Sequence, residues 1–299
     1  MQLTACRTFT IVPEGPFSLR EVAALEVGPR LRTPWDGVLR LAFCADGYDA
    51  HAGVEVRQDD AGVHCVVSGD ADADVVRRQV ERGLSLDHDG AALARIGERD
   101  PVVARLLAAA PGFRPPLFSS PYEAAAWAVL SVRRVPKQMA DVRRRLSEAH
   151  GATFELAGER VAAFPTPDAL LLVDAFAGIA ADRMTRLHGV ARAALDGLLD
   201  VERIRALGPA AAVADLQRIN GIGPFYAEQI VTRASGFADV LPLEETKTLA
   251  LVGELYGLGA PATREQLIAI AEAWRPYRTW VAVLMRAAAS RLTPDTAAP

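Results

Sequence analysis

The sequence contains little cysteine, and its cysteines follow no ligand pattern. Only Cys6, Cys44 and Cys65 occur among the 299 residues. They are odd in number and lack CxxC spacing, so we expect reduced, buried thiols in a cytoplasmic protein. Because no cysteine follows residue 65, a four-cysteine iron–sulfur cluster in the later two-thirds of the chain is excluded.

Other absences exclude further classes of protein. No stretch approaches the about 18 consecutive apolar residues that suggest a spanning helix, so no membrane association is expected. The N-terminal segment MQLTACRTFTIVPEG lacks the apolar core of a signal peptide. The five histidines are scattered without an HxxxH or HxH pair, so no catalytic metal site is expected. With 51% hydrophobic residues, the chain is long enough for two domains with full-sized cores.

The net charge of −4 argues weakly against a general nucleic-acid binder, but the charge is unevenly distributed. Residues 1–115 carry 13 Arg and no Lys against 17 acidic residues, whereas residues 116–299 carry 20 basic and 20 acidic residues. The second part can therefore present a local basic face although the whole chain is acidic.

Residues 1–115 predict a small α+β domain. Four short segments are β-rich and partly alternating, with Gly or Asp turns between them: TFTIV, GVLRLAFCA, GVEVRQ and GVHCVVSG. An amphipathic helix follows, with Val76, Val80 and Leu84 on one stripe. The Pro-rich segment PGFRPPLFSSP, residues 111–121, predicts a linker at the domain boundary.

Residues 116–290 predict an all-α domain of roughly eight to ten short helices, because clear strand candidates are absent. Ser120 with Glu123 three residues later predicts a capping box, and Thr263 begins a second one. The tail, residues 291–299, is expected to be disordered.

The segment LQRINGIGPFYAEQI interrupts this helical pattern with two glycines and a proline. We expect residues 207–235 to form a helix, a tight turn and a second helix. The expected core positions are Leu216, Ile219, Ala227 and Ile230. Gly221 and Gly223 allow backbone conformations and close approaches that a Cβ would obstruct. Unpaired N–H groups at the turn can hold an anion such as a DNA phosphate, and a plain αα-corner is the alternative.

The longer stretch LQRINGIGPFYAEQIVTRASG resembles the helix-hairpin-helix of the DNA glycosylase superfamily, and FADVLPLEETKTLA resembles its catalytic segment. The best match is the DNA-3-methyladenine glycosylase II family. FPTPDAL, AEAWRPYRTWVAVLMRA and PYEAAAWAVLSVRRVPKQMA resemble further stretches of that family. The resemblance is strong from 116 to 290, whereas residues 1–115 match by position and type only. It implies an N-terminal α+β domain followed by an all-α helix-hairpin-helix core.

The resemblance also implies a chemistry and a catalytic residue. Such glycosylases flip a damaged nucleotide out of the duplex and cleave its N-glycosidic bond, while a carboxylate stabilises the sugar cation. The second of two paired aspartates has this role in the family, and Glu244 and Glu245 occupy the two positions here. The extra methylene of Glu245 moves the carboxylate by about 1.5 Å, so the pocket must be rebuilt around it or activity falls. Without the resemblance, a solvated pair at a helix start is the simpler interpretation.

The implied hairpin residues that hold DNA phosphate are Ile219, Gly221, Ile222, Gly223 and Phe225. Superfamily members that also cut the strand have a Lys at the place of Phe225. The resemblance therefore implies a monofunctional enzyme without a Schiff-base step. The candidates for stacking on a flipped base are Phe225, Tyr226, Tyr277 and Trp280. Core packing is the alternative for each of these aromatic residues.

Departures from the family concern the pocket and its basic residues. Arg286 stands where family members can have a pocket aromatic, and Val132 and Arg133 stand where the family often has two glutamines. Arg133, Arg134 and Lys137 form a basic cluster for backbone phosphate or, alternatively, a solvated helix face. Lys247 is a candidate for a phosphate contact or an ion pair. The resemblance also implies that hairpin carbonyls can hold a monovalent cation, and we expect no other cofactor.

Three hypotheses remain open from the sequence. The first is a monofunctional DNA glycosylase that excises alkylated bases from double-stranded DNA in base excision repair, as a cytoplasmic, nucleoid-associated monomer. The second is a glycosylase-fold protein that binds damaged DNA without efficient catalysis, motivated by Glu245. The third is a helical interaction protein that binds no DNA, favoured by the acidic pI of about 5.8.

Overall fold

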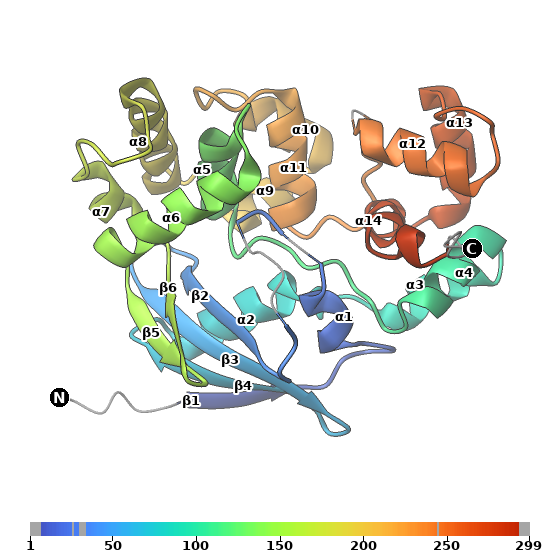
Figure 1. Cartoon of the computed structure of the whole chain (residues 1–299), viewed down its shortest axis with the longest axis horizontal. Coiled ribbons are helices and arrows are strands. Elements are labelled where there is room, and N and C mark those ends of the chain that lie inside the picture. The colour runs from blue at the N-terminus through green and yellow to red at the C-terminus, as the bar shows by residue number, and fades with distance from the viewer. Residues whose placement is uncertain (1–6, 26, 30–33, 244, 293–299) are drawn as a thin grey trace, which may run out of the picture.

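The chain folds into a four-stranded sheet with a broad group of helices above it (Figure 1). The computed structural model describes residues 7–25, 27–29, 34–243 and 245–292. The strands are β1 (Arg7–Ile11), β2 (Leu39–Cys44), β3 (His51–Asp59) and β4 (Gly62–Gly69), arranged as β1-β4-β3-β2 with antiparallel neighbours. The four strands predicted from the sequence are thus confirmed.

The sheet and two helices enclose one hydrophobic core. Helix α1 (Leu19–Ala23) and helix α2 (Ala73–Gly83) contribute its helical side chains. Val76, Val80 and Leu84 are each at most 1% exposed, so the predicted apolar stripe is the buried face of α2.

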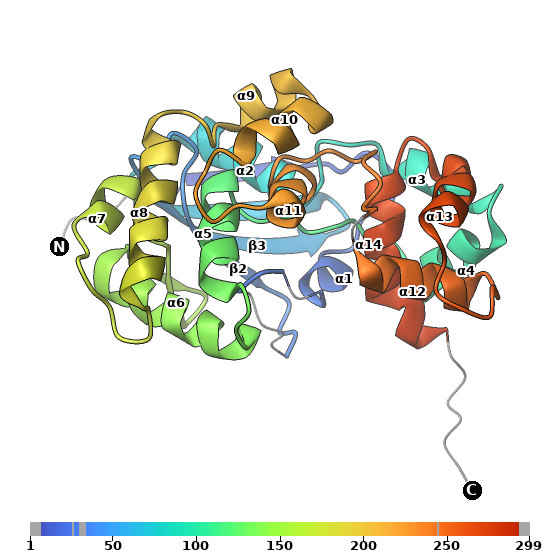
Figure 2. The ribbon, with the colours of Figure 1, turned by 90° about the horizontal axis from the view of Figure 1, so that it is seen from above.

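The remaining helices surround two further cores, and Figure 2 shows α8, α5, α11 and α14 side by side from above. The first of these cores is built by α5 (Pro121–Ser131), α6 (Pro136–His150), α7 (Pro167–Leu171), α8 (Ala181–Leu195), α9 (Val201–Leu207), α10 (Pro209–Leu216) and α11 (Pro224–Ala234). The second is built by α3 (Gly90–Gly97), α4 (Pro101–Ala109), α12 (Thr246–Leu255), α13 (Arg264–Ala271), η1 (Glu272–Trp274) and α14 (Arg278–Ala288), and η2 (Ala289–Arg291) follows.

The expected boundary near residue 115 does not separate the cores. Helices α3 and α4 precede it, yet they share a core with α12–α14. Asp100 shows the connection directly, because it caps the start of α4 and accepts a hydrogen bond from the indole N–H of Trp274 at 3.0 Å. The Pro-rich segment 111–121 is also mostly buried rather than an exposed linker. Within it, the fully buried Arg114 donates hydrogen bonds to the carbonyls of residues in two separate loops: Glu14, Gly15, Pro16, Ser85 and His88.

The prediction that residues 116–290 are all-α is wrong in one place. Strands β5 (Thr153–Leu156) and β6 (Glu159–Ala162) form an antiparallel hairpin that packs beside β2 and β3. Its two-residue turn, Ala157-Gly158, has φ values of +45° and +79°. Positive φ at both residues is typical of tight hairpin turns, whose twist matches that of the flanking strands. Phe154 lies against Gly53 of β3, where an added Cβ would be 2.5 Å from the ring. Because Gly53 has no side chain, the β5–β6 hairpin can pack closely against the sheet.

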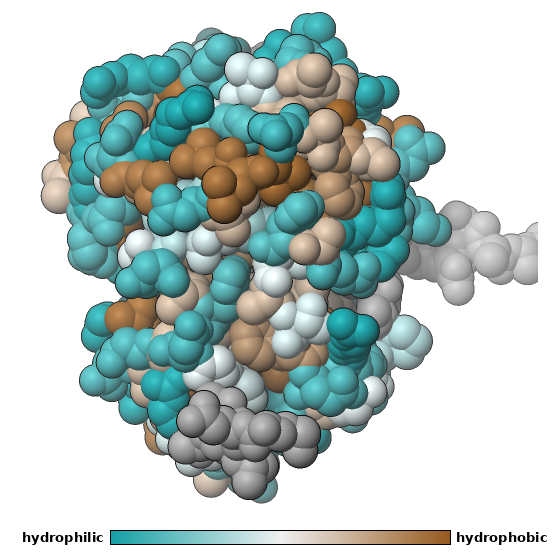
Figure 3. Space-filling model, turned by 90° about the vertical axis from the view of Figure 1, so that its left-hand side faces the viewer, coloured by the Kyte–Doolittle hydropathy of each residue, from teal (hydrophilic) through white to brown (hydrophobic). Residues whose placement is uncertain are grey.

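The face formed by the α6–α8 side is mostly hydrophilic, with a band of hydrophobic residues in its upper half (Figure 3). Leu172, the residue after α7, is strongly exposed. None of the described helices is long and apolar enough to cross a membrane.

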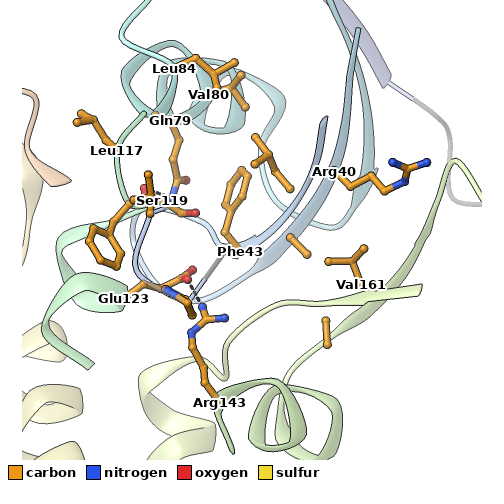
Figure 4. Close-up of a pocket in the computed structure, with 17 residues that line it drawn as sticks. Arg40, Phe43, Gln79, Val80, Leu84, Leu117, Ser119, Glu123, Arg143 and Val161 are labelled. Atoms are coloured by element: carbon orange, nitrogen blue, oxygen red, sulfur yellow. Dashed lines mark hydrogen bonds and ion pairs between the residues drawn. The ribbon is translucent and has the colours of Figure 1, made fainter. Parts of the chain in front are cut away.

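Only one of the two hydrogen bonds of the predicted capping box at α5 forms. The glutamate side chain of the box instead links the sheet to the helices. Ser120 accepts a hydrogen bond from the N–H of Glu123 at 3.2 Å, as predicted. The Glu123 carboxylate, however, points toward Arg143 of α6 and also accepts the N–H of Cys44 of β2 at 3.2 Å (Figure 4). Burial raises the pKa of Glu123, and the charge of Arg143 opposes that shift. These groups border a cavity of about 200 Å³ between sheet and helices.

Replacing Glu123 by Ala removes the partner of a buried guanidinium and leaves the Cys44 N–H unpaired. We expect the free energy of unfolding to fall by about 3–5 kcal/mol. Urea unfolding followed by circular dichroism measures it. The matched control is Glu148→Ala on α6, which breaks an exposed pair with Arg144 and should cost less than about 1 kcal/mol. Equal losses for the two variants would contradict the prediction.

Cys44 and Cys65 are buried free thiols, as expected, whereas Cys6 lies outside the described residues. Burial raises the pKa of Cys65 to about 12 and raises that of Cys44 further still. Since the thiolate is the reactive form, we expect both residues to resist iodoacetamide at pH 8 in the folded protein and to react in urea. Peptide mass spectrometry after labelling measures each residue separately. Rapid modification of either residue in the native state would contradict the prediction.

Candidate functional site

The predicted helix–turn–helix is present as α10, a turn at residues 217–223 and α11. Ile219 and Ile222 anchor the turn, because their side chains are 5% and 3% exposed in the helical core. The Ile222 N–H donates to the carbonyl of Ile219 at 3.0 Å and closes the turn. Gly221 and Gly223 alternate with these isoleucines and are exposed. The turn therefore presents bare backbone to solvent.

The two glycines of the turn have different requirements. Gly221 has φ +96°, a conformation that a residue with a Cβ rarely adopts, and an added Cβ would lie 3.1 Å from the Cδ of Arg186. Gly223 has φ −88° and ψ −180°, and no atom lies within 4 Å of an added Cβ. Only Gly221 is thus required by the fold itself.

Helix α11 begins without a side-chain cap. Gly223 is its N-cap residue and Pro224 its first residue, so neither supplies a capping side chain. No described residue accepts a hydrogen bond from the N–H of Phe225 or Tyr226. Since a helix N-terminus also carries partial positive charge, these N–H groups suit an anion.

Glu245 is the residue immediately before α12, and both of its carboxylate oxygens are engaged. One oxygen accepts the hydroxyl hydrogen of Thr248 at 2.7 Å, and the other accepts a hydrogen bond from the Arg286 guanidinium of α14. The Glu245 side chain is only 13% exposed, whereas that of Arg286 is 34% exposed. The ion pair therefore lies at the edge of the protein surface. Glu244, the other acid of the expected pair, lies outside the described residues.

Glu245 and the first turn of α11 line one cavity of about 410 Å³. Among its described lining residues are several that the sequence singled out: Phe225, Tyr226, Glu245, Lys247 and Arg286. Trp127 of α5 and Gln229 of α11 are among the other residues that line it. The cavity therefore brings together an uncapped helix start, the four aromatic residues Phe118, Trp127, Phe225 and Tyr226, and a carboxylate from distant parts of the sequence.

Two predicted pocket residues do not reach this cavity. The Tyr277 hydroxyl donates to the carbonyl of Asp89 at 2.9 Å, and Trp280 packs edge-on against His88 with ring centroids 5.3 Å apart. Their side chains are 6% and 3% exposed in the core shared with α3 and α4. They are core residues, because helices from the N-terminal part cover that face of α14.

The predicted basic residues occupy two separate places. Arg133, Arg134 and Lys137 are exposed where α5 turns into α6, and Arg133 has an unusual φ of +54°. Lys247 is exposed at the rim between the cavity and a neighbouring groove, which Arg286 also lines. None of these residues except Arg286 has an ion pair with a described residue.

Sequence reasoning missed three contributors to this region. Trp127 lies in a predicted helix, but the apolar residues around it in the sequence did not indicate that its ring borders a cavity. Thr248 lies three residues after Glu245, and this spacing could have predicted their hydrogen bond from the sequence. Arg186 of α8 lies against Gly221, a contact that only the tertiary structure shows. Within the described residues, no group of three or more His, Cys, Asp or Glu is placed to hold a metal ion.

Comparison with known proteins relates this geometry to solved structures. No protein-family model matches the chain, and no curated protein matches it in sequence. A 3-methyladenine DNA glycosylase from Archaeoglobus fulgidus superposes with a TM-score of 0.74 at 22% identity, over 93% of this chain and 96% of that one. The chain has the fold of a DNA glycosylase.

Two further solved structures share this fold. An 8-oxoguanine glycosylase/lyase from Clostridium acetobutylicum superposes with a TM-score of 0.63 at 16% identity, over 96% of this chain and 97% of that one. A 3-methyladenine DNA glycosylase from Schizosaccharomyces pombe in complex with abasic DNA has a TM-score of 0.52 at 22% identity, over 68% of this chain and 97% of that one. The resemblance that the sequence suggested thus has its structural counterpart in the fold.

Because φ at Gly221 is positive, Gly221→Ala should lower the free energy of unfolding by about 1–3 kcal/mol. Gly223→Ala is the matched control, since its backbone is extended and the space around it is open, and it should change stability by less than about 1 kcal/mol. Chemical denaturation of both variants measures the difference. Similar losses at the two positions would show that the turn does not impose the conformation described.

Proposed function

We propose that this protein is a monofunctional DNA glycosylase that excises damaged bases in base excision repair. The observation that carries the proposal is the cavity that both Glu245 and the uncapped first turn of α11 line. The likeness of the fold to glycosylases of both 3-methyladenine and 8-oxoguanine supports it. Double-stranded DNA containing a damaged base is the proposed partner, and the protein acts as a monomer.

In this proposal the hairpin binds the DNA backbone and the cavity receives the flipped base. A phosphate accepts hydrogen bonds from the free N–H groups of Phe225 and Tyr226, next to the exposed Gly221 and Gly223. Ile219 and Ile222 hold the turn in place from below. The rings of Trp127, Phe225 and Tyr226 line the cavity and offer surfaces on which a base can stack.

Glu245 is the proposed catalytic residue. As the N-glycosidic bond breaks, positive charge develops on the sugar, and a nearby carboxylate stabilises that charge before water attacks. Each carboxylate has about four lone-pair sites, so its contacts with Thr248 and Arg286 leave acceptor capacity toward the cavity. Arg286 orients the carboxylate in the free protein, and it must shift or share the carboxylate when the sugar cation forms.

The proposed substrates are alkylated bases, in keeping with the sequence resemblance. Alkylated purines that carry a positive charge are good leaving groups, so the enzyme needs no acid to protonate the base. Aromatic rings stack favourably on such cations. Arg286 and Lys247 add positive charge at the cavity rim, which disfavours binding of a positively charged base. Binding of such a base must therefore rely on the aromatic surfaces and on Glu245.

The hairpin also offers ligands for a monovalent cation. No described residue donates a hydrogen bond to the carbonyl oxygens of Asn220 and Ile222, and such oxygens suit a hard cation. We propose that these carbonyls hold the ion, which would supply positive charge for the bound phosphate. The residues present therefore fit the ion that the resemblance implies.

A second candidate function is recognition of damaged DNA without efficient catalysis. The observation that favours it is the engagement of both Glu245 oxygens, one of them in an ion pair with Arg286. If this ion pair stays closed in the DNA complex, the carboxylate is a weak stabiliser of the sugar cation.

The first experiment is base release from duplex DNA that contains 3-methyladenine or 7-methylguanine, measured as single-turnover rates. We expect release by the wild type and a loss of about 10²-fold or more for Glu245→Gln, because the variant has no negative charge for the sugar cation. Glu254→Gln is the matched control, since Glu254 is an exposed acid on the same helix. Its rate should equal that of the wild type.

The outcomes separate the two candidate functions. No base release by the wild type, together with tight binding to DNA that contains an abasic analogue, would favour the recognition protein. An equal rate for the wild type and Glu245→Gln would remove Glu245 from the proposed mechanism.

Phe225 occupies the second residue of α11, where the strand-cutting relatives have a Lys. Since no amine is available there, sodium borohydride should trap no covalent adduct during base release. Denaturing gels of the reaction with labelled DNA make the measurement. Lys247 also borders the cavity, so Lys247→Ala serves as the comparison. A trapped adduct that disappears in Lys247→Ala would show a lyase step and contradict the monofunctional proposal.

A further inference from the structure

Four arginines gather beside the glycine turn, and we refer to them as the arginine patch. They are Arg133 and Arg134 at the end of α5, and Arg183 and Arg186 on α8. Helix α8 packs against α5, and α5 packs against α11 (Figure 2). The patch therefore forms where three helices meet at the turn, although its residues are about 50 positions apart in the sequence.

Arg183 fixes the shape of the patch. Its guanidinium donates hydrogen bonds to the carbonyls at the end of α5: Val129, Leu130 at 2.7 Å and Val132 at 3.4 Å. These carbonyls have no partner inside a helix, so Arg183 satisfies them and holds the following residues in place. Arg133 and Arg134 come next in the chain, and the positive φ of Arg133 turns the backbone there.

The positive charges of the patch influence one another, and Asp182 is the one acid whose ion pair with the patch is described. Burial and the charges of Arg134 and Arg186 lower the pKa of Arg183, while Asp182 and Tyr226 oppose this shift. Asp182 is the acid paired with Arg186, at 3.4 Å, and it is itself 67% exposed. Such an exposed pair within one helix is weak, so an incoming anion can replace the Asp182 carboxylate at Arg186.

Arg186 connects the patch to the turn, and Tyr226 connects it to the cavity. The Cδ of Arg186 lies so close to Gly221 that an added Cβ would be 3.1 Å away. The stem of the Arg186 side chain thus lies against the exposed Gly221. Tyr226 affects the pKa of Arg183 and also lines the cavity that contains Glu245. Arg186 thus joins the patch to the turn, and α11, which begins at the end of the turn, carries Tyr226 of the cavity wall.

We infer that the arginine patch is a second phosphate site, in which Arg186 and Arg134 bind the DNA backbone next to the phosphate held at Gly221–Gly223. Two arginines near a bare backbone turn provide positive charge and guanidinium donors for the repeating phosphates of one nucleic-acid strand. Arg183 is a positioning residue, because its donors are used by the end of α5. This inference rests on the proposed function in taking DNA as the ligand.

The test is the salt dependence of DNA binding, measured by fluorescence anisotropy with full-length protein. Two duplexes of one sequence are compared, one undamaged and one with a central tetrahydrofuran abasic analogue. The variant is Arg186→Gln, which keeps much of the side-chain stem against Gly221 but removes the charge. The controls are Arg186→Lys, which restores the charge, and Arg192→Gln, which removes an exposed arginine elsewhere on α8.

We expect Arg186→Gln to reduce the slope of log affinity against log salt by about one on both duplexes, because one phosphate contact is lost. Arg186→Lys should recover most of the slope, and Arg192→Gln should keep it. An unchanged slope in Arg186→Gln would overturn the inference. An equal reduction in Arg192→Gln would also overturn it, because the effect would then come from net charge alone.

Base release is measured separately, so failure of the inference and failure of the proposed enzyme can be told apart. If the wild type releases no base but Arg186→Gln loses one unit of slope, the phosphate site stands and the glycosylase proposal fails. If base release occurs and the slope does not change, the enzyme stands and the phosphate site is overturned. If the wild type shows no salt-dependent binding to either duplex, both proposals are overturned.

Discussion

The backbone conformation at Gly221 is the constraint on which the candidate site depends. With φ at +96°, the chain reverses within a few residues, so α11 can begin while Ile219 and Ile222 remain buried. The same reversal leaves the N–H groups of Phe225 and Tyr226 without protein acceptors. The turn thus buries its apolar side chains and leaves polar backbone exposed, and this exposed backbone is the candidate anion site.

The orientation of Glu245 in the cavity depends on packing between helices that are far from the turn in the sequence. Glu245 stands at the start of α12, and its orientation is fixed by Thr248 and by Arg286 of α14. Helices α12 and α14 are in turn packed on α3 and α4, which come from the first part of the chain. The N-terminal part therefore supports the Glu245 side of the cavity as well as the sheet. Its contribution explains why the boundary expected near residue 115 does not divide the molecule into separate cores.

Buried polar side chains join the layers at specific points. Glu123 links α5 to β2 and α6, and Arg114 donates hydrogen bonds to carbonyl groups of two separate loops. In both cases the charged group is buried with partners, as buried charges require. The cavity beside Glu123 differs from the cavity beside Glu245. The Glu123 carboxylate is buried, and its interactions stabilise the fold. Burial and partners, rather than residue type, distinguish the structural acid from the candidate catalytic acid.

The sequence by itself determined the strands of the sheet, the stripe of α2, the glycine turn between α10 and α11 and the position of Glu245 before α12. These features depend on local rules: alternation, helical periodicity, capping and the need for glycine at positive φ. The tertiary structure alone decided which aromatic rings line the cavity, because Phe225 and Tyr277 are both aromatic residues near helix starts but only one faces open space. It also decided the partner of Glu245 and the contact of Arg186 with Gly221. Such contacts join residues on different helices, and no local pattern specifies which helices will meet.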